Sequence, residues 1–335
     1  MAAVEELDIK VSSCLHMVSA FLAMEPPDVV ISFVREFGEG SITESVQSCI
    51  WHHCITKADL KWQGPYLKRF LKKLILEIES SGGLVLDELY EQYASYMISL
   101  QNDDDNKGNF RVLKTISFLF PNANLTDGLL ILIPAEISKP NSKVGSGVGL
   151  VGICLSYVKA SKVILSDGDL STLANMKVNL ELNHLSTDDL EHQKKVHCVC
   201  LPWESASEDD LHCFAPDIIL GADIIYDPSC LPHLVRVLSL LLKHKKHSHA
   251  EVGAAGRALD GLPADELLRH PLGRGSVAYI ASVIRNIDTF NYFLSLAKQA
   301  KLVVTDLTEK VEVSKFLPYL RSYQRSSIRI FRIHV

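Results

Sequence analysis

The fold of this chain is decided by the stretch Val144-Gly145-Ser146-Gly147-Val148-Gly149-Leu150-Val151-Gly152, which is followed by Val163-Ile164-Leu165-Ser166-Asp167. Glycines at alternate positions form a turn in which backbone N–H groups can approach a ligand closely. The apolar run after the turn predicts a helix, and the next apolar run predicts a short strand that ends in an acidic residue. A carboxylate at that point can accept hydrogen bonds from ribose hydroxyls, so the stretch indicates a binding site for a nucleotide-type cofactor.

Two spacings of glycine fit this turn. Gly145, Gly147 and Gly149 match the G-x-G-x-G turn of S-adenosylmethionine enzymes. Gly147, Gly149 and Gly152 match the dinucleotide fingerprint G-x-G-x-x-G, for which Asp167 lies at a suitable distance. The glycines alone leave both cofactors open.

The composition of the chain limits its class. A length of 335 residues favours two domains, and a net charge of −6 argues against a nucleic-acid binder. The first ten residues are acidic, and the longest apolar run, residues 218–225, is far shorter than a membrane span. The eight cysteines lack metal-ligand spacing, so we expect buried thiols and no metal. These features predict a cytoplasmic, monomeric protein with no membrane or nucleic-acid partner.

The pattern of apolar residues changes along the chain. Residues 1–100 show helical spacing and predict an all-helical domain, and the polar residues 101–109 predict a linker. From residue 110 to 335 short apolar runs alternate with helical patterns, interrupted by an irregular insertion at 244–275. The predicted strands are 116–120, 129–133, 163–165, 196–201, 217–220, 277–284 and 328–333, and the predicted helices are 150–158, 170–182, 231–242 and 289–300. This alternation predicts an α/β, doubly wound, Rossmann-like sheet.

Three predicted strands end in residues that suit a ligand site. The first ends at Asp167, the second is followed by Trp203 and Glu204, and the third by Ala222-Asp223-Ile224-Ile225-Tyr226. Ligands of doubly wound sheets bind beyond the carboxyl ends of the strands, so we expect these residues to lie in one cleft.

At these residues the chain resembles a known family. Four segments resemble the seven-strand protein-lysine methyltransferases with an Asp-x-x-Tyr motif. They are the glycine turn, residues 173–183 with Asn175 and Asn179, Leu201-Pro202-Trp203 and Gly221-Ala222-Asp223-Ile224-Ile225-Tyr226. The helical region, including residues 67–75 and Asp87-Glu88-Leu89-Tyr90-Glu91, together with Ile284-Arg285-Asn286 and Phe316-Leu317-Pro318-Tyr319, is similar to the eukaryotic elongation factor 2 lysine methyltransferases.

The resemblance implies a seven-stranded methyltransferase sheet and transfer of a methyl group from S-adenosylmethionine to a lysine of elongation factor 2. It also implies roles for the residues that match the motifs. Those expected to hold the cofactor are Gly145, Ser146, Gly147 and Gly149 in the turn, Asp167 at the ribose, and Trp203 and Ala222 at the adenine. Asp223 and Tyr226 are expected to face the target lysine. No metal is implied.

The chain departs from the family pattern before the glycine turn. An apolar strand ending in an acidic residue is expected there, but Pro140-Asn141-Ser142-Lys143-Val144 is polar and carries a lysine. The first strand of the sheet is therefore doubtful, although the strand predicted at 129–133 could take its place. We interpret residues 121–143 as a lost or replaced segment and expect weakened cofactor binding, since Lys143 would oppose the methionine ammonium.

Two other functions remain open at this stage. One is a dinucleotide-dependent oxidoreductase, which the second glycine spacing would allow. The other is a non-catalytic variant whose helical domain binds elongation factor 2 or a chaperone while its cofactor site is impaired.

Overall fold

The computed structural model describes residues 12–99, 112–120, 129–137, 147–157, 160–185, 196–243, 275–311 and 317–335. The linker predicted at 101–109, residues Gly145 and Ser146 of the glycine turn, and nearly all of the insertion predicted at 244–275 lie outside these ranges. Within them, no helix combines the length and apolar character that crossing a membrane requires.

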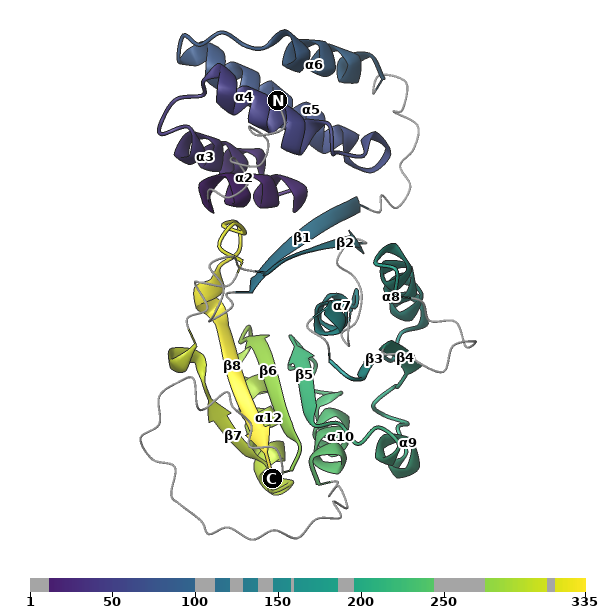
Figure 1. The fold of residues 1–335 in the computed structure, drawn as a ribbon. Helices are drawn as coiled ribbons and strands as arrows, with labels where there is room; N and C mark the ends of the chain where they lie inside the picture. The colour runs from purple at the N-terminus through teal and green to yellow at the C-terminus, as the bar shows by residue number, and fades with distance from the viewer. Residues whose placement is uncertain are drawn as a thin grey trace.

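The first part of the chain is helical, as its apolar spacing predicts. Its helices are α2 (Ser12–Leu22), α3 (Pro27–Phe37), α4 (Glu44–Ile50) with the π-helical extension η1 (Trp51–Ile55), α5 (Leu60–Ser80) and α6 (Asp87–Ser99). Figure 1 shows these helices stacked at one end of the molecule, above a β-hairpin. Their apolar faces share one core, which is completed from outside the helices by Ile116 and Tyr319.

The hairpin consists of β1 (Val112–Phe120) and β2 (Leu129–Ile137), which pair antiparallel along their whole length. The prediction that the strand at 129–133 could take the place of the first strand of the main sheet is wrong. In the described residues this strand is part of β2, which pairs with β1 in a separate two-stranded sheet.

The remaining strands have the predicted order along the chain. They are β3 (Val163–Asp167), β4 (Val196–Cys200), β5 (Ile218–Ala222), β6 (Val277–Val283), β7 (Val303–Asp306) and β8 (Ile328–His334). The helices between them are α7 (Leu150–Tyr157), α8 (Leu170–Leu182), α9 (Glu208–His212), α10 (Leu231–Lys243) and α12 (Ile287–Gln299), with short 3₁₀ turns η2 (Thr308–Lys310) and η4 (Arg325–Ser327). The α/β, Rossmann-like class is confirmed. The sequence did not predict β7, the shortest strand, or the five-residue α9.

These strands form two sheets. β3 pairs in parallel with β4, while β5, β6, β8 and β7 form a second sheet in that order, with the first pair parallel and β8 antiparallel to both neighbours. Within the described ranges, no strand joins β3 to β5. The break lies where the sequence makes the first strand doubtful. On β5, Ile218 and Leu220 keep 53% and 45% of their surface exposed, in keeping with that open edge.

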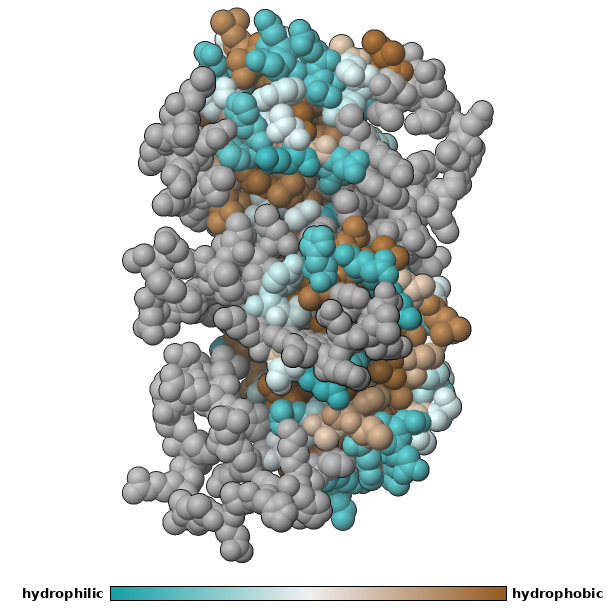
Figure 2. Space-filling model, turned by 45° about the vertical axis from the view of Figure 1, so that its right-hand side comes forward, coloured by the Kyte–Doolittle hydropathy of each residue, from teal (hydrophilic) through white to brown (hydrophobic). Residues whose placement is uncertain are grey.

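Each part of the α/β region has its own apolar core. α7 and α8 pack on β3 around Leu165 and Met176. α10 and α12 pack on β6 and β8, around residues such as Leu234, Ile280 and Phe293. The space-filling view shows apolar patches between polar ones at the upper end of the molecule and around the middle of its right-hand side (Figure 2).

Candidate active site

The glycine turn packs tightly against the strand and helix that follow it. A Cβ on Gly152 would lie 2.3 Å from Leu165 Cδ2, and one on Gly149 would lie 2.8 Å from Met176 Cγ. Gly147 and Gly149 also have φ angles of +55° and +82°, which favour glycine. Among the described residues, a Cβ on Gly147 would meet nothing within 4 Å, so this residue borders space that they leave open. The turn is therefore close-packed at Gly149 and Gly152, and at Gly147 it leaves room for a ligand to approach.

A side chain on α8 fixes the position of this turn. Asn179 is fully buried, and its Nδ2 donates a hydrogen bond of 2.9 Å to the carbonyl oxygen of Val148. The resemblance pointed to Asn179 but assigned it no role. In the structure it anchors the turn.

Asp167 lies at the end of β3 with only 3% of its surface exposed. Burial raises its pKa above the ordinary 3.8, while hydrogen bonds from the backbone N–H groups of Asp169, Gly147 and Gly168 oppose the rise. One of these bonds runs from Asp169 N to Oδ1 over 3.0 Å. Its other oxygen, Oδ2, is buried without a hydrogen-bond partner among the described residues. A buried acceptor in this state calls for a donor, and the adjoining glycine turn is where one could enter.

Trp203 follows β4 and is half-buried against the apolar cores on either side of it. Arg236 on α10 holds this segment in place, because its Nη2 donates to the carbonyl oxygen of Trp203 (2.8 Å) and its Nη1 to that of Ala206 (2.7 Å). Trp203 thus belongs to the core as well as to the rim of the sheet.

Asp223 directly follows Ala222, the last residue of β5, in an unusual backbone conformation. Its φ is +55°, and its N–H donates to the carbonyl oxygen of Ala281 on β6 over 2.7 Å. A left-handed conformation is uncommon outside glycine and is often retained at functional sites. Its carboxylate forms a two-pronged ion pair with Arg285, with Nη1–Oδ1 and Nη2–Oδ2 distances of 2.9 and 2.7 Å. Tyr226, three residues on, leaves 36% of its surface exposed.

A chain of contacts connects these residues along one rim. The backbone N–H of Gly147 donates a hydrogen bond to the carboxylate of Asp167. Leu201 N donates to the carbonyl oxygen of Asp167, so the ends of β3 and β4 lie side by side. Further along, Cys230 Sγ lies 3.7 Å from Glu204 Oε1 and 3.8 Å from Asp227 Oδ2. The segment with Trp203 therefore adjoins the loop that follows Tyr226.

Sequence reasoning missed Arg285 as a site residue and quoted it only as part of a similar motif. The available sequence signal was its place directly after the strand predicted at 277–284; the structure adds that this strand, β6, is parallel to β5 and adjacent to it. A metal is not indicated by the described residues, which contain no group of three or more His, Cys, Asp or Glu arranged to hold one.

Comparison with known proteins identifies the kind of chemistry. A model of the lysine methyltransferase family matches residues 139–253, which include the glycine turn, Asp167, Trp203, Asp223 and Tyr226. An uncharacterised protein of Dictyostelium discoideum is 29% identical over 320 residues, covering 81% of each chain. The human protein-lysine N-methyltransferase EEF2KMT is 25% identical over 236 residues, covering 64% of this chain and 72% of the relative.

A solved precorrin-6y C5,15-methyltransferase from Geobacter metallireducens gives a TM-score of only 0.33 at 14% identity, over 57% of this chain and 75% of that chain. The assignment therefore rests on the sequence matches, which select the S-adenosylmethionine form of the glycine turn over the dinucleotide form. The matched domain identifies this chain as an S-adenosylmethionine-dependent protein-lysine methyltransferase, and over more than half of its length it is similar to EEF2KMT proteins.

Proposed function

We propose that this enzyme methylates a lysine of elongation factor 2 in the cytoplasm. The substrate is inferred from relatives named EEF2KMT in human and mouse, which are 25% and 26% identical and match 64% and 57% of this chain. The main support for a methyl-transfer site here is the buried carboxylate of Asp167, whose Oδ2 has no hydrogen-bond partner among the described residues and which lies beside Gly147.

The described residues fit S-adenosylmethionine on its ribose side. Oδ2 of Asp167, which has no hydrogen-bond partner among the described residues, would accept a hydrogen bond from a ribose hydroxyl, and the turn at Gly147 and Gly149 would let the ligand approach the backbone. Trp203 and Ala222 would border the adenine. Gly145 and Ser146, proposed for the methionine part, lie outside the described residues.

The lysine side of the site would consist of Asp223 and Tyr226. S-adenosylmethionine supplies a methyl group on a positively charged sulfur. A lysine amine with a solution pKa of about 10.4 is almost fully protonated at pH 7, so it must release a proton to water before its nitrogen can accept the methyl. The Asp223 carboxylate would orient the amine. The exposed ring of Tyr226 would hold the cationic, methylated product through its π face. Alignment of the amine with the methyl group would account for most of the acceleration.

The test is transfer of labelled methyl from S-adenosylmethionine to purified elongation factor 2, with mass spectrometry to locate the modified lysine. Asp223→Ala should abolish transfer. Asp209→Ala, which removes an exposed carboxylate on α9, should leave it unchanged and serves as the matched control. Equal transfer by wild type and Asp223→Ala would remove Asp223 from the mechanism, and labelling of another protein in preference to elongation factor 2 would change the substrate.

The break between β3 and β5 supports a second candidate, a binding protein for elongation factor 2 or a chaperone with an impaired cofactor site. It predicts capture of elongation factor 2 without methyl transfer. Calorimetry separates the two functions, since S-adenosylmethionine affinity in the micromolar range would contradict an impaired site.

A further inference from the structure

The ion pair between Arg285 and Asp223 joins two strand ends at the rim of the sheet. The two terminal guanidinium nitrogens of Arg285 donate, one to each oxygen of Asp223. Such a two-pronged pair fixes the plane of the carboxylate, which a single hydrogen bond would leave free to rotate. The side chains remain 61% and 39% exposed, so a substrate could reach the pair.

Arg285 is itself held on a short, well-fixed segment. β6 ends at Val283, and Asn286 caps α12 by accepting hydrogen bonds from Asp288 N (2.8 Å) and Thr289 N (3.2 Å). Only two residues separate the strand from this cap. The guanidinium therefore extends from a rigid connection toward Asp223, whose backbone is bonded to Ala281 on the same strand.

We propose that Arg285 is a positioning residue for lysine methylation, which acts through Asp223 by fixing the carboxylate and offsetting its charge. This inference rests on the proposed function. A carboxylate has about four lone-pair sites, so the guanidinium occupies one on each oxygen and leaves others for the substrate amine.

The charge of Arg285 bears on how easily the bound lysine loses its proton. An unpaired carboxylate would stabilise the lysine ammonium and hold back the neutral amine that the reaction needs. With Arg285 across the carboxylate, the ammonium meets a neutralised pair and a nearby like charge, which both favour proton loss. The pairing is reflected in Arg285, whose pKa is raised by its hydrogen bonds and charge interaction with Asp223.

Other titratable groups lie on the neighbouring segments of this rim. They are Tyr226, Asp227 and Cys230 after β5, Glu204 after β4, Asp288 in the first turn of α12, Asp167 at the end of β3 and Asp169 after it. The other cations at this end of the sheet are Arg236, which is bonded to carbonyl oxygens of the segment after β4, and Arg329, which is paired with Asp306; the remaining side chains are acidic or neutral. Removing Arg285 would therefore leave a more negative rim, which would strengthen retention of the lysine proton.

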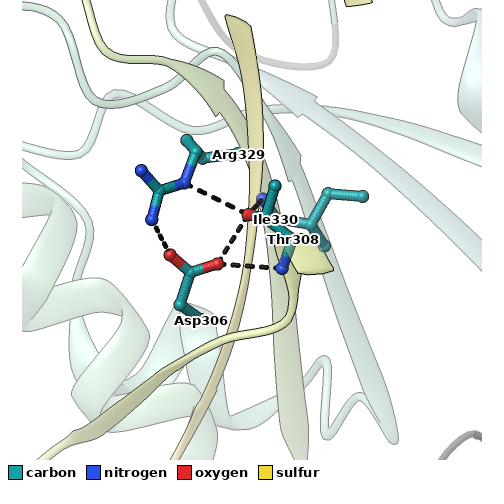
Figure 3. Close-up of polar contacts among 4 residues, drawn as sticks. All are labelled: Asp306, Thr308, Arg329 and Ile330. Carbon is teal, nitrogen blue, oxygen red and sulfur yellow. Dashed lines mark hydrogen bonds and ion pairs between the residues drawn. The ribbon is translucent and has the colours of Figure 1, made fainter. Parts of the chain in front are cut away.

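The test compares Arg285→Gln and Arg285→Lys with a matched control, Arg329→Gln. Arg329 also pairs with an aspartate, Asp306, and contacts Thr308 at the same sheet (Figure 3), but it lies on β8, two strands from β5. Initial rates of methyl transfer to elongation factor 2 are measured against pH at saturating S-adenosylmethionine.

Arg285→Gln should raise the apparent pKa of the kcat profile by about one unit, which lowers kcat about tenfold near neutral pH. The loss should shrink as the pH rises, and KM should not increase. Arg285→Lys should keep the apparent pKa near that of wild type but lower kcat, since an ammonium cannot form the two-pronged pair. Arg329→Gln should match wild type throughout.

An Arg285→Gln profile that superimposes on wild type, or that falls equally at every pH, would overturn the role of Arg285 while leaving the proposed function intact. A wild-type enzyme that methylates some other protein, with the same shift in Arg285→Gln, would overturn the substrate and keep the role of Arg285. Wild-type protein that transfers no methyl to any lysine would overturn both.

Discussion

Replacing Tyr319 by Phe should weaken the attachment of the helical region to the rest of the chain. Tyr319 is completely buried in the core of the N-terminal helices. Its hydroxyl donates to the carbonyl oxygen of Ser117 and accepts from the N–H of the same residue, each over 2.8 Å. Burial raises its pKa to about 12, and the hydrogen bonds with Ser117 oppose the rise. The phenol thus joins β1 to a turn near the C-terminus.

The cost of Tyr319→Phe follows from these two bonds. Each buried hydrogen bond contributes about 1 kcal/mol net, and a buried backbone group left without a partner costs about 1–3 kcal/mol. Because Phe keeps the ring and its packing, we expect the free energy of unfolding to fall by about 2–3 kcal/mol. The same loss should speed amide exchange at Ser117 about thirtyfold or more, if exchange there follows opening of this contact.

The assay combines urea denaturation with hydrogen–deuterium exchange of the peptide that contains Ser117. Tyr323→Phe is the matched control, because Tyr323 is 60% exposed and should change stability by less than about 0.5 kcal/mol. A Tyr319→Phe protein as stable as this control, with unchanged protection at Ser117, would refute the reasoning.

Three further changes have expected outcomes. Gly152→Ala should lower the free energy of unfolding, measured by calorimetry, by about 1–3 kcal/mol, because the added Cβ would lie 2.3 Å from Leu165 Cδ2. Asp167→Asn should weaken S-adenosylmethionine binding at least tenfold by titration calorimetry. As the pH is lowered, the wild-type affinity should begin to fall above pH 3.8, because the raised pKa of Asp167 means that its carboxylate is protonated at a higher pH than an ordinary aspartate. Arg321→Gln should cost about 1 kcal/mol in urea denaturation, since it removes an exposed ion pair with Glu36 and a cation–π contact 3.8 Å from the centre of the Phe33 ring.

Local patterns were enough to predict most of the elements. The runs at 163–165 and 277–284 are short, apolar and bounded by polar residues or glycine, and both are strands. Glycine spacing located the turn, and the position of Asp167 after a strand located its carboxylate. β7 was missed because its apolar run, Leu302-Val303-Val304, is short and begins two residues after the end of the helix predicted at 289–300.

Contacts between distant residues could not be predicted in the same way. Arg285 and Asp223 are 62 residues apart, and Ser322 donates through both its N–H and its hydroxyl to the buried carboxylate of Glu25, 297 residues away. No periodicity in either segment indicates the partner, because such pairs depend on which strands and helices become neighbours. The pairing of β6 with β5 is what brings Arg285 to Asp223.

The organisation of the rim explains how a site can persist across the break between β3 and β5. In the proposed site the ribose side lies at the end of β3 and the lysine side follows β5, and no described strand connects these two. They are instead linked through the segment that follows β4. Arg236, on the helix that follows the Tyr226 loop, holds the segment after β4, and the carbonyl oxygen of Asp167 holds the start of that segment through Leu201 N. One backbone bond and the two hydrogen bonds of Arg236 therefore connect the proposed cofactor side of the site to the proposed lysine side.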